Sequence, residues 1–300
     1  MNELRLSPAQ VESYNELGYI VLESAVPQEL LARIRQETDD VVAKAGDVDA
    51  NDDVYDLEAS HTRDNPRVRR IKEPRHLMPA VNELVRSPVV GAIVAQLFGT
   101  GVRLQNTKMN MKFAEYGAPV EWHQDWTFYP HTNDDLLAMG LYLDDCDADN
   151  GPLMVIPGSH RGTVFNHHVD GRFCGAMNPD ECDLDYASAH ELTGPAGSLT
   201  FHHVRAVHGS RTNVSDRPRR LLLAQYTAVD AWPLVKVPTD IHQYDSEIIY
   251  GEPTVKPRLA DVPVILPLPP ATFDGSIYEN QRTLGNRYFG EHAGVADAAE

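Results

Sequence analysis

From about residue 102 onward, the chain consists of short β-type runs separated by glycine, proline, asparagine and aspartate. This spacing is typical of an antiparallel β-sandwich or β-barrel. Helical segments do not alternate with these runs, which disfavours a doubly wound parallel sheet. The predicted strands cover residues 102–112, 136–143, 153–157, 197–203 and 219–227.

The first hundred residues show mainly helical patterns. A first helix is predicted to end at Gly18, a second to follow Pro27, and a third to cover residues 89–98, where capping residues and glycine stops flank apolar residues at helical spacing. A short apolar run at 19–22 indicates one strand among them. The aspartate-rich residues 45–66 are predicted to form an exposed loop.

We therefore expect an α+β chain with one domain over residues 1–300. In this division, residues 1–100 form a mainly helical part and residues 101–230 form the β core. The long polar segment 161–191 lies between two predicted strands, and segments of that kind often act as lids. Residues 231–300 are rich in proline, which predicts an irregular wrap around the core.

Charge limits the partners that such a chain can bind. The formal net charge is −18 and the isoelectric point is about 5.0. A polyanion would meet a repulsive field, so nucleic acid and anionic membranes are poor partners. A small-molecule partner remains, and the sequence leaves the oligomeric state open.

Cysteine usage and the ends of the chain favour a cytoplasmic location. The three cysteines are odd in number and form no CxxC pair, so neither a disulfide framework nor a cysteine zinc site is indicated. The first residues lack a basic segment followed by an apolar stretch, and no uninterrupted apolar run approaches the roughly 18 residues of a membrane span.

A possible metal-binding pair occurs at His123-Gln124-Asp125. On a strand, side chains two residues apart project from the same face, so this histidine and aspartate could chelate one metal ion. The pattern alone is weak, because thirteen histidines and 44 acidic residues in this chain give about two such matches by chance. A second match occurs at His168-Val169-Asp170, in the polar segment and without a strand pattern around it.

A third ligand must come from a distant strand, because iron centres that activate O₂ commonly use two histidines and one carboxylate. His208 stands at a strand end, is followed by a turn rich in polar residues, and precedes Arg219, which begins the next strand. A guanidinium group there could receive a carboxylate through two parallel hydrogen bonds. Arg220 should occupy the opposite strand face. His202 and His203 are rival ligands on the preceding strand.

These motifs resemble the phytanoyl-CoA dioxygenase-like branch of the Fe(II)/2-oxoglutarate-dependent oxygenases. The resemblance covers residues 5 to about 228. It rests on Gly18-Tyr19-Ile-Val, Trp122-His-Gln-Asp125, the run from Leu143 to His160 with Asn150-Gly-Pro-Leu and Pro157-Gly-Ser-His, and His208-Gly-Ser with Asn213, Ser215 and Arg219. The long middle run is the most specific part, because its length and order match throughout.

The resemblance implies a double-stranded β-helix, or cupin-like jelly roll, with the N-terminal helices packed on it. It further implies His123, Asp125 and His208 as Fe(II) ligands and Arg219 as the residue that binds 2-oxoglutarate. Weaker cosubstrate candidates are Ser210, Lys112, Gln105 and Lys72, and candidates for a substrate wall are Trp126, Phe128, Tyr129 and His131. Where some members carry a tryptophan before the Asp-Asp pair, this chain has Gly140, which alters that wall of the pocket.

The implied activity is that of a dioxygenase that hydroxylates a C–H bond of a small molecule, with 2-oxoglutarate and O₂ as cosubstrates. The same oxidant could instead be used for desaturation, epimerisation or ring formation in natural-product biosynthesis. A different class of protein is a metal-containing jelly roll that binds a small ligand without turnover. The presence of three ligands together with Arg219 disfavours that alternative.

Overall fold

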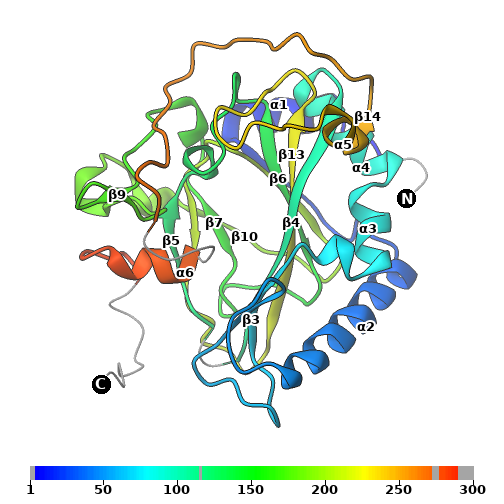
Figure 1. The fold of residues 1–300 in the computed structure, drawn as a ribbon, viewed down its shortest axis with the longest axis vertical. Helices are drawn as coiled ribbons and strands as arrows, with labels where there is room; N and C mark the ends of the chain where they lie inside the picture. Colours follow the sequence, from blue (N-terminus) through cyan, green and yellow to red (C-terminus); the bar gives the residue numbers. More distant parts are fainter. Residues whose placement is uncertain (1–3, 115–116, 272–276, 290–300) are drawn as a thin grey trace.

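The computed structural model describes residues 4–114, 117–271 and 277–289. Within these residues the core consists of two facing antiparallel sheets. The larger sheet has the strand order β1-β11-β6-β13-β4-β3-β2, with β14 paired to β4, and the smaller has the order β10-β7-β12-β5. This arrangement is the expected α+β jelly roll, shown in Figure 1.

The larger sheet contains β1 (Tyr19–Leu22), β2 (Tyr55–Leu57), β3 (Val68–Lys72), β4 (Val102–Lys112), β6 (Leu136–Tyr142), β11 (Leu199–His203), β13 (Arg219–Ala228) and β14 (Ile248–Tyr250). The smaller sheet contains β5 (Val120–His123), β7 (Leu153–Val155), β10 (His190–Leu192) and β12 (His208–Ser210). A separate hairpin is formed by β8 (His168–Val169) and β9 (Arg172–Phe173). The β4 boundaries agree with the predicted strand, and the other four predicted strands are confirmed to within two residues at each end.

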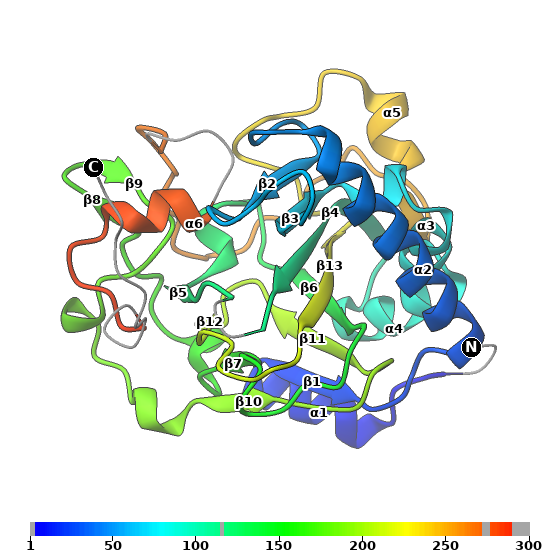
Figure 2. The same cartoon turned by 90° about the horizontal axis from the view of Figure 1, so that it is seen from below.

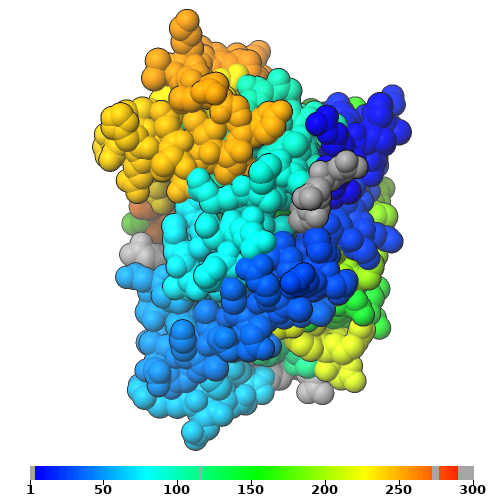
Figure 3. Space-filling model, turned by 90° about the vertical axis from the view of Figure 1, so that its right-hand side faces the viewer, coloured from blue at the N-terminus to red at the C-terminus, as the bar shows by residue number. Residues whose placement is uncertain are grey.

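Helices cover the outer face of the larger sheet. They are α1 (Pro8–Leu17), α2 (Gln28–Lys44), α3 (Pro79–Val85) and α4 (Pro88–Phe98). Figures 1 and 2 show α2, α3 and α4 together on one side of this sheet, and Figure 3 shows the continuous surface that they form there. The main hydrophobic core lies between these helices and the sheet, and includes Leu31, Ile34, Leu84, Met109 and Leu222.

Alternation along the strands separates this core from the inner space of the jelly roll. Met109 and Met111 of β4 face the helices, whereas Lys108 and Asn110 line a cavity between the two sheets. The same alternation holds on β13, where Leu222 joins the core and Leu223 lines the cavity. Successive side chains of a strand point to opposite faces, so one strand serves both regions.

The predicted exposed loop at 45–66 is wrong in its middle, where Tyr55–Leu57 forms the buried strand β2. Asp56 of this strand forms ion pairs with Arg70 at 2.5 Å and Lys72 at 3.0 Å on β3, and Tyr55 donates its hydroxyl hydrogen to the Val41 carbonyl. These tertiary contacts compensate the charge of a segment whose composition alone indicates a solvated loop.

The stretch Pro79–Phe98 has the length and apolar composition of a membrane span. In this fold it is divided into α3 and α4, and Ser87 caps the second helix by accepting a hydrogen bond from the backbone of Val90. Both helices bury residues in the core, among them Val81, Leu84 and Ile93. The stretch therefore supplies core helices of the jelly roll.

The segment 161–191 is largely irregular, apart from the β8–β9 hairpin, short 3-10 turns and the start of β10. The turns are η4 (Ser159–Arg161), η5 (Pro179–Glu181) and η6 (Tyr186–Ser188). Two backbone groups tie the segment to the strand end of β5, because Phe165 donates to the Gln124 side chain and Met177 donates to the Trp122 carbonyl. The segment thus lies beside the end of β5.

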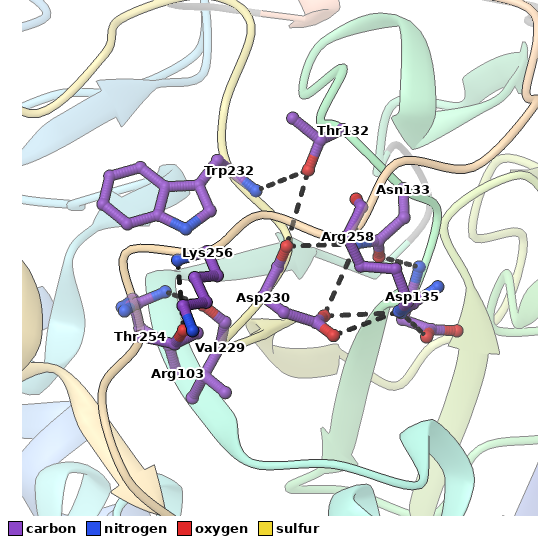
Figure 4. A network of polar contacts seen from close by, with 10 residues as sticks. All are labelled: Arg103, Thr132, Asn133, Asp135, Val229, Asp230, Trp232, Thr254, Lys256 and Arg258. Carbon is purple, nitrogen blue, oxygen red and sulfur yellow. Dashed lines mark hydrogen bonds and ion pairs between the residues drawn. The ribbon is translucent and has the colours of Figure 1, made fainter.

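The described part of the C-terminal wrap contains α5 (Ile241–Ser246), β14, α6 (Ile277–Asn280) and η7 (Gln281–Thr283). Figure 4 shows how it is fastened to the core: the Arg258 guanidinium pairs with Asp230 and Asp135, and Asn133 donates to the Asp230 and Arg258 carbonyls. Further along, the Trp126 indole donates to the Pro263 carbonyl at 2.8 Å. The wrap thus closes one end of the barrel, and α6 lies beside β5 (Figure 1).

Candidate metal and cosubstrate site

Three buried side chains converge at one end of the smaller sheet. His123 ends β5, Asp125 follows in η3 (Asp125–Thr127), and His208 begins β12. Because β5 and β12 are antiparallel neighbours, His208 lies opposite His123, and their ring centroids are 4.1 Å apart. One ligand atom of each of the three residues lies within 4.8 Å of the others.

Backbone carbonyls fix the orientation of both imidazoles. The Nδ1 of His123 lies 2.8 Å from the Glu121 carbonyl oxygen, and the Nδ1 of His208 lies 2.9 Å from that of Ala206. Since a carbonyl only accepts, each Nδ1 carries the proton and each Nε2 keeps a free lone pair. Histidine ligands of metals are commonly held in this way.

The charge states also suit a cation. Burial lowers the pKa of both His123 and His208, so the two rings are neutral at pH 7. Burial alone would raise the pKa of Asp125, but the Lys108 ammonium and the surrounding imidazoles outweigh it and hold that pKa below its ordinary value. The cluster therefore offers two neutral nitrogens and one anionic oxygen.

This donor set fits Fe(II). Two imidazoles and one carboxylate on one side of an ion, with the other positions open, are the ligands of non-haem iron oxygenases. The cavity beside the cluster has a volume of about 40 Å³ and is lined by both polar and apolar side chains.

Two buried cations, Arg219 and Lys112, stand opposite each other on β13 and β4, and Arg219 but not Lys112 lines the cavity. Arg219 is 2% exposed and donates from Nε and Nη2 to the Gly151 carbonyl, while its Nη1 has no partner. Lys112 is 1% exposed and donates to the Arg211 carbonyl. Neither forms an ion pair with a carboxylate of the described residues. Burial of uncompensated charge is costly, so this pair indicates an anionic ligand.

Ser210 and Tyr278 line the same cavity as Arg219. Tyr278, on α6, is buried, and its hydroxyl group has no partner among the described residues. The Arg69 guanidinium lies 5.2 Å from the centre of its ring. Sequence reasoning missed Tyr278, because nothing in the proline-rich wrap indicates that its end returns to the cavity.

Three of the weaker cosubstrate candidates, Lys112, Lys72 and Gln105, are not among the residues that line this cavity. The Lys72 ammonium donates to the Asp52 carbonyl and pairs with Asp56. Gln105 lies where the register between β4 and β13 shifts by one residue, and its side-chain oxygen is buried without a partner. Lys72 shares the strand face of Arg70 and stands opposite Lys108, but its ammonium is held by Asp52 and Asp56 instead of lining the cavity.

The four candidates for a substrate wall divide into two pairs. Phe128 packs edge-on against His123, with ring centroids 6.1 Å apart, and the Tyr129 backbone donates to the Asp125 carbonyl at 3.2 Å. Trp126 is fully buried in a separate hydrophobic cluster, and His131 bonds to the Tyr129 carbonyl. Phe128 and Tyr129 thus lie near the cluster, whereas Trp126 and His131 pack away from it.

The rival histidines take different positions. His168 belongs to the β8–β9 hairpin and bonds to Asn166 and to the Leu268 carbonyl. His203 accepts a hydrogen bond from the Arg205 backbone and does not line the cavity. His202 does line it, with Nε2 3.9 Å from the Asp125 carboxylate, and both of its ring nitrogens are buried without a partner. It lies beside the three-residue cluster.

Gly140 faces the cavity side of the larger sheet. A Cβ atom there would lie 2.5 Å from Thr200 Oγ1 and 3.0 Å from a methyl carbon of Leu221. Leu223 also packs nearby. Two leucines of β13 thus occupy the space beside Gly140, which leaves no room for a large side chain.

Sequence reasoning also missed three cavity residues, namely Arg70 on β3 and Lys108 and Asn110 on β4. The alternation of polar and apolar residues along β4 was a usable signal. However, it shows only that the polar side chains share one face. Whether that face meets water or an internal cavity depends on the second sheet.

Comparison with known proteins gives a consistent result. The profile of the family described as "Phytanoyl-CoA dioxygenase (PhyH)" matches residues 14–221. A probable alpha-ketoglutarate-dependent hypophosphite dioxygenase of Stutzerimonas stutzeri is 38% identical over 284 residues, which cover 93% of this chain and 99% of that protein. L-proline trans-4-hydroxylase of Streptomyces griseoviridis is 36% identical over 171 residues, which cover 50% of this chain and 63% of that protein.

A solved structure shows the same architecture. EctD from S. alaskensis with bound Fe superposes with a TM-score of 0.67 at 25% identity, covering 79% of this chain and 84% of that chain. The similarity thus extends over the jelly roll and the helices that cover it.

Proposed function

The chain belongs to the phytanoyl-CoA dioxygenase family, and from this premise we propose which of its residues carry the chemistry. The protein is a non-haem dioxygenase that depends on Fe(II) and 2-oxoglutarate and hydroxylates a small molecule. We assign His123, Asp125 and His208 as the iron ligands. The observation that carries this assignment is the buried cluster of two neutral imidazoles and one carboxylate.

We assign the buried cations Arg219 and Lys112 to the distal carboxylate of 2-oxoglutarate, with Ser210 and Tyr278 beside them. Arg219 has an unpartnered Nη1, and a carboxylate there would restore the charge balance of both cations. The backbone carbonyl bonds of Arg219 hold its guanidinium group in place before the cosubstrate arrives.

When bound, the iron supplies O₂ activation, so that one oxygen atom enters the substrate and the other enters succinate as 2-oxoglutarate loses CO₂. The protein's residues position the reactants and exclude water. His123 and His208 present fixed nitrogen lone pairs, and Asp125 remains an anion beside them. Phe128 covers the His123 ring from one side.

For the substrate, we propose hypophosphite, whose hydroxylation at a P–H bond gives phosphite. The support is the 38% identity to the hypophosphite dioxygenase over nearly the whole of both chains. This would change the bond attacked from the C–H bond expected from the sequence to a P–H bond. L-Proline is the second candidate, because the proline hydroxylase is similarly identical over half of this chain.

The test is a substrate assay with Fe(II), ascorbate, 2-oxoglutarate and O₂. Hypophosphite should stimulate succinate formation and give phosphite by ³¹P nuclear magnetic resonance, in one-to-one ratio. Hydroxyproline formation without phosphite would establish the second candidate. Absence of both products, in protein that binds Fe(II) and 2-oxoglutarate, would overturn the substrate assignment and leave the cofactor assignment standing.

We also propose a single domain in the cytoplasm, with neither nucleic acid nor membrane as a partner. The three cysteines are unpaired, as expected in a reducing compartment, and the net charge of −18 opposes binding of polyanions. The segment 161–191 would act as a lid over the cavity.

A further inference from the structure

A third cation, Lys108, lies in the same cavity as the metal cluster. It stands on the inner face of β4, directly opposite Leu223 of β13 and Lys72 of β3. Its side chain lines the cavity together with His123 and Asp125. Within the described residues, its ammonium group has no hydrogen-bond or ion-pair partner, and the carboxylate on which its charge acts is that of Asp125 in the metal cluster.

Lys108 is separate from the cations assigned to 2-oxoglutarate. Lys112 lies four residues further along β4, which at about 3.3 Å per residue is about 13 Å away. Lys112 stands opposite Arg219, whereas Lys108 acts electrostatically on Asp125 and His202. Arg219 and Lys112 therefore lie together near Gly151, and Lys108 lies beside the metal cluster.

Arg70 adds a second positive group to the same wall. It stands on β3 opposite Asn110 and lines the cavity. Its guanidinium pairs with Asp56 at 2.5 Å, but that buried carboxylate also pairs with Lys72 at 3.0 Å. Asp56 thus pairs with both Arg70 and Lys72, and Arg70 and Lys108 place two basic side chains on one wall of the cavity.

Two polar side chains lie close to Lys108. Tyr129 and Asn106 are near each other, and Asn106 precedes Lys108 by two residues and shares its strand face. Tyr129 follows the metal cluster in the chain and is close enough to Lys108 to be affected by its charge. Groups from β3, β4 and the loop after β5 therefore meet beside the cluster.

We propose that Lys108, supported by Arg70, binds an anionic group of the primary substrate next to the iron. The subsite rests on the proposed dioxygenase function and deepens it, because it requires the substrate to be an anion. The group that this subsite binds is a compact oxyanion, which is either hypophosphite itself or the carboxylate of an amino acid. A neutral substrate would leave the Lys108 ammonium without an ion-pair partner.

The rival role for Lys108 is to neutralise Asp125 and thereby support iron binding alone. The two roles differ in what a substitution changes. Loss of a substrate contact weakens binding of the substrate anion and leaves Fe(II) and 2-oxoglutarate affinities unchanged. Loss of a neutralising charge would change the affinity for Fe(II) first.

The experiment compares Lys108→Met with Lys108→Arg and with Lys44→Met, an exposed control at the end of α2. Each protein is loaded with Fe(II) and 2-oxoglutarate without O₂, and the dissociation constants of hypophosphite and L-proline are measured by calorimetry. We expect Lys108→Met to weaken binding of the recognised anion about 30-fold or more. Lys108→Arg should restore most of it, and Lys44→Met should behave as the parent protein.

Fe(II) and 2-oxoglutarate affinities are measured in the same variants, which also shows that each variant is folded. Unchanged anion affinity in Lys108→Met, or a loss confined to Fe(II), would overturn the subsite. Parent protein that binds Fe(II) and 2-oxoglutarate but neither anion would also overturn it, while leaving the dioxygenase function intact. Failure to bind Fe(II) and 2-oxoglutarate at all would instead refute the proposed function. Which of the two anions binds identifies the source of the oxyanion.

Discussion

Arg219 and Lys112 face each other across the antiparallel pair of β13 and β4, and both are almost fully buried. Like charges directly opposite in a sheet are destabilising. Within the described residues neither cation has a carboxylate partner, and Arg219 keeps one nitrogen unpaired. The pair is therefore best explained as a preformed site for the dianion 2-oxoglutarate.

Arg219→Ala should raise the KM for 2-oxoglutarate about 30-fold or more, because loss of one side of a buried charge pair costs about 2–5 kcal/mol. The neighbouring residue provides the control. Arg220 points to the opposite face, as predicted, and pairs with Asp144 and Asp39 at 2.7 Å each. Arg220→Ala should therefore lower Tm and change this KM less than twofold, as measured by succinate formation. Similar effects on KM at both positions would refute the assignment.

Removal of any metal ligand should abolish both iron binding and turnover. His123→Ala, Asp125→Ala and His208→Ala should each weaken Fe(II) binding by more than the ~10–100-fold that groups outside the ligand set contribute. His168→Ala should bind iron as the parent protein does, because His168 is held in the β8–β9 hairpin by Asn166 and the Leu268 carbonyl. Iron content after gel filtration measures both results. Iron lost from the His168 variant alone would contradict the assignment.

Lys112 predicts a pH dependence of cosubstrate binding. Burial and then the charge of Arg219 lower its pKa well below the ordinary value. A bound carboxylate favours the charged ammonium and raises this pKa. At pH values between the pKa of Lys112 in the free protein and its pKa in the complex, Lys112 therefore takes up a proton when 2-oxoglutarate binds. The affinity for 2-oxoglutarate should then fall as pH rises through that window. Calorimetry in buffers of different ionisation enthalpy measures the proton uptake. Lys112→Met should bind more weakly and show less uptake, and unchanged uptake would assign it to another group.

Helices and strands with a strong local sequence pattern could be predicted from the sequence. The strand at 102–112 is long, alternates apolar and polar residues, and coincides with β4. By contrast, β2 has only three residues and depends on Asp56 pairing with Arg70 and Lys72, contacts that no local pattern contains. Short strands that depend on tertiary ion pairs are therefore missed when secondary structure is predicted from the sequence alone.

The residues of the candidate site likewise divide into those that local sequence motifs identify and those whose positions depend on the tertiary structure. The order of His123, Asp125, His208 and Arg219 within family motifs located the metal cluster and one of the two buried cations. Lys108 was missed because strand periodicity assigns a side chain to a face and does not reveal what covers that face. Tyr278 was missed because its position depends on the whole path of the wrap, whose residues have no regular pattern.

Gly140 should tolerate no larger side chain. An added Cβ would lie 2.5 Å from Thr200 Oγ1 and 3.0 Å from Leu221, so Gly140→Ala should destabilise the fold by about 1–3 kcal/mol through overpacking. Gly285→Ala is the matched control, since no described atom lies within 4 Å of a Cβ at that position. Urea unfolding measures the difference. Equal stability of the two variants would show that β13 yields easily at this point.

The segment 161–191 should close over the cavity when both ligands are bound. Its first half is fixed, because Phe165 and Met177 bond to the strand end of β5, whereas Pro179–Glu181 and Tyr186–Ser188 are turns without buried residues. Hydrogen exchange should therefore be slow at Met177 in every state. It should be fast at residues 179–188 in the free enzyme and slower with substrate and 2-oxoglutarate together. Strong protection of residues 179–188 in the free enzyme would instead show that the segment is a rigid wall of the cavity.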